Sequence, residues 1–465
     1  MVPRGSPASN RADRTDQARG AYLVRMTTPP RIARTRLAAA ALVVVLLLGA
    51  CGTSPPRSPA AGGSASAGPS ATSLPEASRS AVGADLDRLV EVLERTHPDP
   101  YHGTDRATFL AALDAFEAAL PDRTPEAAMV ELMRIWAMLS REGRDGHQFA
   151  MPVAGAGGPL LPIRVYEFAE GDFVTEAAPP HEDLAGARIT AVGGTPVEDV
   201  LAAIEPLVPR DGPATVPAFR PFFFLRTDVL RGLGILDEGS VTIDVERGGE
   251  VATVALEPVT FEAWTEWGAG LGLQQLPADE RVRYLADPAP FSAELLDDGV
   301  AYVRYRAVSH PDVTAVRRWW DAGEATSLVV DLRQNPGGDN GTYGPLLALV
   351  EEVAAADPRA VTVLVDRVTF SAAANLATEI EARTDARFVG EPMGGGLNFW
   401  DDVQWLRLEG LPIPMELAIS VRYWQFADAD DPRLTIEPEL PVEVTAADFF
   451  AGRDPALEAA LGSFD

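Results

Sequence analysis

Residues 300–383 alternate short apolar runs with helical segments, and this alternation constrains the fold more than any other feature. The apolar runs are rich in β-branched residues and are short enough for buried strands, at 300–305, 327–332 and 361–365. Helical segments are expected at 312–321, 346–355 and 372–380. Strands that alternate with helices usually pair in parallel. The sequence therefore predicts an α/β region with a partly parallel sheet under helices.

Two of these predicted strands end in features suited to acyl chemistry. One runs into the Gly-rich turn RQNPGGDNG, and the next runs into VTFSAAAN, where Ser371 precedes an alanine-rich helix. Open α/β sheets place their sites at the carboxyl ends of strands, and a helix N-terminus favours developing negative charge. Ser371 is therefore a candidate nucleophile. Serine is also a common helix cap, so this stretch alone leaves both interpretations open.

The first fifty residues are typical of an export signal. They contain eight arginines and two acidic residues, and an apolar run covers 37–48. The run ends at Cys51, the only cysteine, in a pattern that resembles a bacterial lipoprotein signal. We expect removal of residues 1–50, lipidation of Cys51 and a cell-membrane location on the extracytoplasmic face. An ordinary signal peptide or a transmembrane anchor is the alternative.

Composition excludes several classes of function. The formal charge of −29 disfavours nucleic-acid binding. A single cysteine permits no intrachain disulfide. The histidines show no close ligand spacing, so the sequence predicts no metal and no cofactor.

Changes in composition divide the rest of the chain. A Ser-, Gly- and Pro-rich segment at 51–80 predicts a lipidated flexible linker. A helical N-terminal domain is expected at 81–150, a PDZ-like or plain β-rich domain at 151–260, and the α/β domain at 261–465. The PDZ-like interpretation comes from 184–204, where a strand, a tight Gly turn and a helix resemble part of a PDZ domain. Such a domain would bind a polypeptide by strand addition. The fold class is thus multi-domain α/β, or α+β over the whole chain.

Four motifs carry a resemblance to a known family. VDLRQNPGG, VDRVTFSAAAN, FVGEPMGGG and IEPELPVEV occur in the order and spacing of tail-specific, or carboxy-terminal processing, proteases. The resemblance covers roughly 150–460 and implies a ClpP/crotonase-like catalytic domain. It also implies a serine-type peptidase with Ser371 as nucleophile and a polypeptide substrate. The oxyanion hole would come from Gly338 (or Gly337) and Ala372.

The chain departs from this family at the base. Well-known members use a lysine in the turn after GEP, but Gly396 stands there and the chain contains no lysine at all. Arginine cannot replace it, because its pKa keeps it protonated. His147, in a DGH that resembles the lysine-less branch of the family typified by the tricorn core, is the predicted base; His310 ranks second. We expect Nε2 of His147 within about 2.6–3.2 Å of Ser371 Oγ, although a purely structural role for His147 is the alternative.

A carboxylate should orient the base. The histidine-using relatives place it shortly before the final IEP-type motif, which implies the loop with Asp428, Asp430 and Asp431. Asp431 is our choice, with Glu437, Glu391 and Asp145 as alternatives. Asn398 and Asp401 follow the Gly turn and receive no role.

Two other functions stay open for the whole protein. The chain could be a catalytically inactive binding or scaffold lipoprotein, because the lysine is missing. It could also be an acyl transferase or esterase that uses the same serine. The sequence does not predict the substrate's identity or the oligomeric state.

Overall fold

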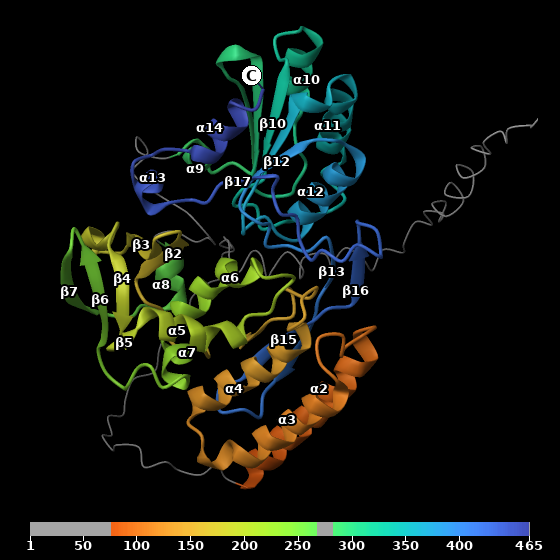
Figure 1. Ribbon diagram of the computed structural model, residues 1–465. Helices are drawn as coiled ribbons and strands as arrows, with labels where there is room; N and C mark the ends of the chain where they lie inside the picture. The colour runs from red at the N-terminus through yellow and green to blue at the C-terminus, as the bar shows by residue number, and fades with distance from the viewer. Residues whose placement is uncertain (1–75, 267–281, 465) are drawn as a thin grey trace, which may run out of the picture. The chain divides into compact units, whose positions relative to one another are not determined.

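The computed structural model describes residues 76–266 and 282–464 (Figure 1). The predicted signal segment, Cys51 and most of the predicted linker lie outside the described residues. The last part of that linker is helical, because α2 begins at Glu76. Within the described ranges, no helix has the length and apolar character needed to cross a membrane.

The predicted parallel sheet is present and has six strands. Their order is β17-β12-β11-β10-β9-β8, and every neighbouring pair is parallel except β8–β9. The strands are β8 (Phe291–Leu295), β9 (Val300–Tyr305), β10 (Ser327–Asp331), β11 (Val361–Val365), β12 (Arg387–Gly390) and β17 (Leu440–Pro441). The fold is thus the multi-domain α/β class that the sequence predicts.

Helices cover both faces of this sheet (Figure 1). On one face, α10 (Thr314–Asp321), α11 (Gly344–Ala356) and α12 (Ala372–Arg383) share a core with Val303 and Val363. On the other face, α14 (Pro455–Leu461) packs on Tyr302 and Leu364. Adjacent strand residues belong to opposite cores because side chains alternate along a strand. Burial on both faces explains the continuous apolar runs in the sequence.

The middle region contains a second sheet, of antiparallel strands in the order β2-β3-β4-β6-β7. These are β2 (Ile163–Phe168), β3 (Gly171–Ala177), β4 (Arg188–Val192), β6 (Val241–Arg247) and β7 (Glu250–Leu256). After β4 come a turn at Gly193 and Gly194, the short β5 (Thr195–Pro196) and α5 (Val197–Ile204). The β-rich character and this strand–turn–helix order are as expected, and the PDZ-like assignment stays a prediction. The helices α6 (Thr215–Phe224), α7 (Thr227–Gly232), α8 (Phe261–Glu266) and α9 (Arg283–Ala286) were not predicted.

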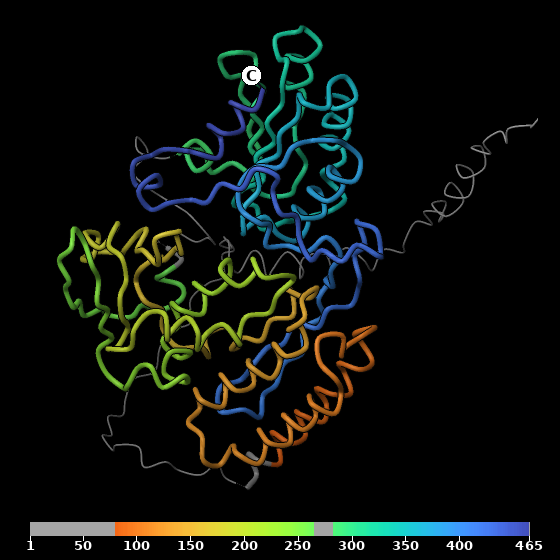
Figure 2. The backbone as a smooth tube through the Cα atoms, in the orientation of Figure 1, coloured from red at the N-terminus to blue at the C-terminus, as the bar shows by residue number. Residues whose placement is uncertain are grey.

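The N-terminal helices are joined to strands from the far end of the chain. The helices α2 (Glu76–Thr96), α3 (Arg106–Ala119) and α4 (Pro125–Ala137) lead to β1 (Ala150–Pro152). That strand pairs with β15 (Met415–Ile419), which pairs with β14 (Gln404–Leu408). Figure 2 shows this blue C-terminal segment beside the orange and yellow N-terminal part. One hydrophobic core therefore contains residues from all three predicted domains, and the domain boundaries stay predictions.

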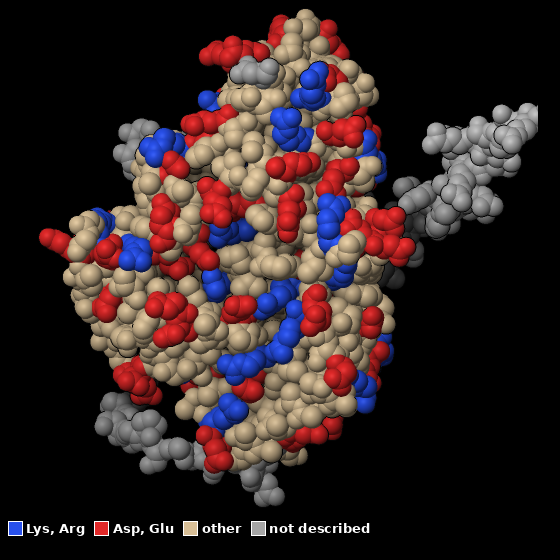
Figure 3. Space-filling model, viewed as in Figure 1, with Lys and Arg blue, Asp and Glu red and all other residues tan. Residues whose placement is uncertain are grey.

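Two further strands form a short antiparallel ribbon. β13 (Asn398–Asp401) pairs antiparallel with β16 (Arg422–Gln425). The remaining helix, α13 (Ala446–Phe450), follows β17. Acidic side chains are spread over the face shown in Figure 3, with arginines between them, as the net charge of −29 leads one to expect.

Candidate active site

Ser371 lies in a strained turn between β11 and α12. Its φ of 52° and ψ of −126° are unusual for a residue with a side chain, and such a conformation costs on the order of 1–3 kcal/mol. The side chain makes no capping hydrogen bond to the helix. Its hydroxyl donates instead to Asp401 Oδ2 at 3.4 Å. Ser371 thus stands at the N-cap position without the side-chain hydrogen bond of a cap, and the turn directs its hydroxyl toward a carboxylate.

Asp366 ties this turn to the Gly-rich turn that follows β10. Its carboxylate accepts backbone N–H groups from Gln334 at 3.1 Å, from Val368 at 2.9 Å and from Thr369 at 3.1 Å. The pKa of Asp366 is raised to about 6, by burial first and by nearby Glu391 second, against the hydrogen bonds from Gln334. One buried carboxyl group thus holds the two turns at neighbouring strand ends in place.

The Gly-rich turn lies directly against Ser371. A Cβ atom added to Gly337 would lie 2.6 Å from Ser371 Cβ, and one added to Gly338 would lie 2.1 Å from the Val308 carbonyl oxygen. Both glycines have positive φ, 111° and 146°. Only glycine fits at these two positions, because a side chain would meet backbone or the serine itself.

Of the two predicted glycine donors, Gly338 is the available one. The Gly337 N–H already donates to Asn335 Oδ1 at 2.9 Å. Among the described residues, the N–H groups of Gly338 and Ala372 have no hydrogen-bond partner. Two unpaired N–H groups beside a serine hydroxyl are what an oxyanion hole requires.

The His147 ring lies between two aromatic rings and close to Asp401. Its ring stacks on Phe370 at 4.5 Å and on Phe399 at 5.4 Å between centroids. Its Nε2 lies 3.4 Å from Asp401 Oδ2, the same oxygen that the Ser371 hydroxyl reaches. Neither ring nitrogen makes a hydrogen bond within the described ranges, so the expected direct bond to Ser371 is not formed. Serine and histidine instead converge on one carboxylate oxygen.

A second buried carboxylate, Asp211, holds the turn that carries His147. Asp211 accepts the Gly146 N–H at 2.5 Å and the Gly396 N–H at 3.1 Å. Burial raises the pKa of Asp211 to about 6, against the effect of His147 and of these two N–H groups. Gly396, where the resemblance would put a lysine, therefore donates its N–H to the same Asp211 carboxylate that holds the His147 turn.

Asp401, and not Asp431, is the carboxylate that contacts His147. Burial raises the pKa of Asp401, and the His147 ring opposes that rise. Asp431 pairs with Arg433 at 2.8 Å, which lowers the pKa of Asp431. Arg433 in turn pairs with Glu381 at 2.8 Å. The Asp431 carboxylate therefore has other partners, and its predicted role has no contact to support it among the described residues.

The remaining predicted candidates lie elsewhere. Glu391 pairs with Arg367 at 2.7 Å, and Asp145 contacts His97 at 3.2 Å. His310 and Glu437 are exposed. Asp401 and Asp211 were the residues that sequence reasoning missed. Asp401 had a weak signal, since it closely follows the Gly turn, and Asp211 had none.

A cavity of about 430 Å³ lies beside the site rather than at it. Its wall includes Gly143 and Gly212, neighbours in sequence of the His147 turn and of Asp211. Ser371 and His147 do not line it.

Comparison with known proteins shows similarity of structure only. No family model matches the chain, and no curated protein matches it. Mature CPAF complexed with lactacystin aligns with a TM-score of 0.54 and 13% identity, over 84% of this chain and 98% of that one. A serine-to-alanine mutant of CPAF aligns with a TM-score of 0.56 and 14% identity, over 82% and 96%.

The photosystem II D1 C-terminal processing protease aligns less closely, with a TM-score of 0.36 and 16% identity over 82% and 98%. On the two CPAF alignments, the chain shares the multi-domain α/β fold of S41 proteases such as CPAF, at low sequence identity.

Proposed function

We propose that this protein is a serine-type peptidase that cleaves polypeptides through an acyl-enzyme on Ser371. One observation carries the proposal: the strained Ser371 hydroxyl and His147 Nε2 approach the same Asp401 oxygen, each at 3.4 Å. Backbone strain of this kind is concentrated at functional sites. The S41-like fold and the motifs around Ser371 support a polypeptide as substrate.

The first step forms a bond between Ser371 Oγ and the carbonyl carbon of the substrate. His147 accepts the hydroxyl proton as general base, and the carbonyl oxygen becomes an oxyanion facing the Gly338 and Ala372 N–H groups. Asp401, close to His147, stabilises the positively charged imidazole. For this the ring must move toward Ser371 from its present position, and catalytic hydrogen bonds commonly tighten when substrate binds.

The second step breaks the peptide bond. His147 returns the proton to the leaving amine nitrogen, which gives the acyl-enzyme and a new amino terminus. Water then attacks the ester carbon while His147 takes one of its protons. His147 gives that proton to Ser371 Oγ as the ester bond breaks, which releases the carboxylic acid and free Ser371. The chemistry balances without a metal, an oxidant or another cofactor.

The decisive experiment labels the purified protein with a fluorophosphonate probe and digests a broad peptide library. We expect labelling at Ser371 and cleavage, both lost in Ser371→Ala, with the melting temperature little changed. Ser309→Ala is the matched control and should label and cleave as wild type does. Absence of labelling and cleavage in folded wild-type protein would refute the proposal.

The scaffold hypothesis is the second candidate, and one observation favours it: His147 makes no direct hydrogen bond to Ser371 within the described ranges. The probe experiment separates the two functions, because a scaffold binds polypeptide without being labelled. An esterase or acyl transferase would be labelled but would leave the peptide library intact.

We also propose that the protein is lipid-anchored at Cys51 on the extracytoplasmic face of the cell membrane. The support is the sequence pattern alone, in which an arginine-rich segment and an apolar run end at the only cysteine. Labelled fatty acid should enter the wild-type protein and not Cys51→Ser, and the variant should leave the membrane fraction. Equal labelling of both proteins would refute this anchor.

A further inference from the structure

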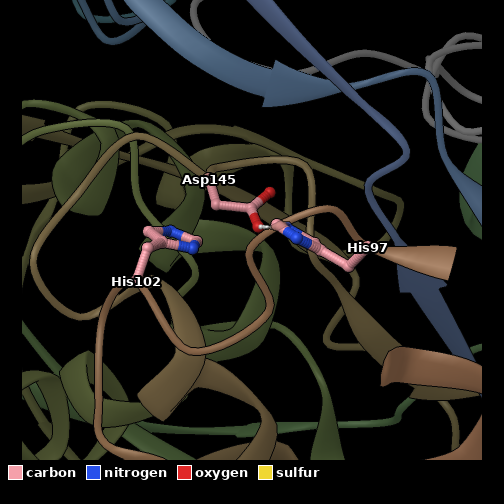
Figure 4. Close-up of side chains that lie close together, drawn as sticks. All are labelled: His97, His102 and Asp145. Atoms are coloured by element: carbon pink, nitrogen blue, oxygen red, sulfur yellow. Dashed lines mark hydrogen bonds and ion pairs between the residues drawn. The ribbon is translucent and has the colours of Figure 1, made fainter. Parts of the chain in front are cut away.

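Two histidines and an aspartate converge in one cluster, of which His97 and Asp145 are buried (Figure 4). His97 follows α2, His102 lies in the next turn, and Asp145 belongs to the turn that leads to His147. One ligand atom from each side chain lies within 4.8 Å of the other two. His97 is 2% exposed and Asp145 is fully buried. In Figure 4 the two imidazoles point toward the carboxylate from opposite sides.

His102 carries a lone pair that the protein itself does not use. Its Nδ1 lies 3.0 Å from the Asp99 carbonyl oxygen, which can only accept, so Nδ1 carries the proton. Nε2 is therefore unprotonated in the neutral ring. That atom is buried and has no hydrogen-bond partner in the described part of the chain. Metal-binding histidines are typically held in this way, with the distal N–H on a backbone carbonyl.

His97 and Asp145 are paired through a proton. The Asp99 N–H donates to His97 Nδ1 at 3.0 Å, so Nε2 carries the proton and donates to Asp145 Oδ2 at 3.2 Å. The other oxygen, Asp145 Oδ1, accepts the Ser420 hydroxyl at 2.6 Å. The Nε2 proton thus occupies the position that an ion would take, and ion binding must displace it.

We propose that His97, His102 and Asp145 form a binding site for a divalent transition-metal ion of the Zn²⁺ type. Two imidazoles and a carboxylate suit such an ion, with a water in the fourth position. Ligand atoms around zinc are about 3.3 Å apart, given bonds of about 2.0–2.1 Å. The distance of 3.2 Å between His97 Nε2 and Asp145 Oδ2 already matches that spacing. His102, which is less buried, must move closer to the other two side chains to complete the site. His97 must move its proton to Nδ1, which gives up the single hydrogen bond from Asp99.

The site is linked to both segments that carry the proposed base machinery. Asp145 stands two residues before His147. The Trp400 ring lies 4.6 Å from the His97 ring and 6.1 Å from the His102 ring, and Trp400 precedes Asp401. An ion bound here would fix the geometry of both segments. Binding itself does not depend on the proposed peptidase activity.

Titration of the chelator-treated full chain with Zn²⁺ by calorimetry, with metal content by mass spectrometry, tests the site. We expect one ion per chain in wild type and at least about tenfold weaker binding in His102→Phe. Phenylalanine keeps the ring beside Trp400 and removes the ligand. His310→Phe is the matched control at an exposed histidine and should bind as wild type does.

Cobalt(II) gives a second readout that needs no variant. Co²⁺ bound to wild type should show visible absorption bands of a four- or five-coordinate ion with nitrogen ligands, and Zn²⁺ should displace it. Wild type that binds neither ion at micromolar concentrations overturns the site. Equal affinities in folded His102→Phe and His310→Phe also overturn it, because the ion then binds elsewhere.

Discussion

The two halves of the proposed active site are built in different ways. The nucleophile half, with Ser371, Gly337 and Gly338, stands at the ends of the adjacent parallel strands β10 and β11. The base half brings His147, Asp211 and Asp401 together from three segments that are far apart in sequence. Backbone register positions the first half, whereas side-chain contacts to backbone N–H groups and rings position the second.

This difference predicts different responses to substitution. The nucleophile half tolerates no added atoms, because its glycines meet backbone at close range. The base half contains a histidine that makes no hydrogen bond among the described residues, so its geometry can adjust when substrate binds. We expect substitution of the glycines in the first half to act on stability, and changes in the second half to act on rate.

After the loss of the nucleophile itself, the largest effect is expected from Asp401→Asn, which removes the charge beside His147. Without that charge, the imidazolium formed during catalysis loses its stabilisation, and kcat/KM should fall by about 10²- to 10⁴-fold. The melting temperature should change little, because asparagine has nearly the same shape. Steady-state kinetics on a cleaved peptide measure the effect. A loss smaller than about threefold would remove Asp401 from the mechanism.

Gly338→Ala tests the other half. Its Cβ would lie 2.1 Å from the Val308 carbonyl oxygen at a φ of 146°, so backbone must shift. We expect destabilisation by about 3 kcal/mol, measured by urea unfolding. The control is Gly344→Ala at the start of α11, where a Cβ would meet nothing within 4 Å. Equal effects of the two substitutions would contradict the close packing.

The raised pKa of Asp366 predicts how the free energy of unfolding depends on pH. Its folded pKa of about 6 lies above the ordinary 3.8. A raised folded pKa means that the proton favours the folded state. The resulting stability is therefore present below about pH 4 and lost as the pH rises through 6. The total loss for one such group is about 3 kcal/mol.

Asp366→Asn should remove this component of the pH dependence. Urea unfolding of wild type and variant at pH 4, 5, 6 and 7 measures it, and the difference between the two proteins isolates the single group. Parallel stability curves for the two proteins would show that the Asp366 carboxyl group does not titrate in this range.

The smallest effect is expected from Asp431→Asn. This side chain pairs with Arg433, whose side chain is 47% exposed, and such pairs contribute about 0–1 kcal/mol. Activity should stay within about twofold of wild type, because Asp401 occupies the position beside His147. A loss as large as that of Asp401→Asn would restore Asp431 as the orienting acid.

The nucleophile half could be predicted from sequence because local patterns encode it. Apolar runs mark β10 and β11, and the Gly-rich turn and Ser371 follow directly at the strand ends. Parallel pairing then places these turns side by side. The strain at Ser371 could not be predicted, since the turn around it is packed against Gly337 and is held by Asp366 through the N–H groups of Val368 and Thr369.

The base half was only partly predictable. His147 was chosen from a DGH motif, and its ring does approach the Asp401 oxygen that the Ser371 hydroxyl also reaches. Asp401 and Asp211 were missed because their roles depend on long-range packing that leaves no periodic signal. The His97, His102 and Asp145 cluster was missed for the same reason, since Asp145 lies 48 residues beyond His97.

The pairing of β1 with β15 has a consequence for biosynthesis. His147 precedes β1, and Ala150 pairs with Leu417, far later in the chain. The segment that carries Ser371 is translated before β15, so the proposed nucleophile emerges while the strand that follows the His147 turn lacks its partner. The proposed base can therefore take up its position only after Met415–Ile419 has been made.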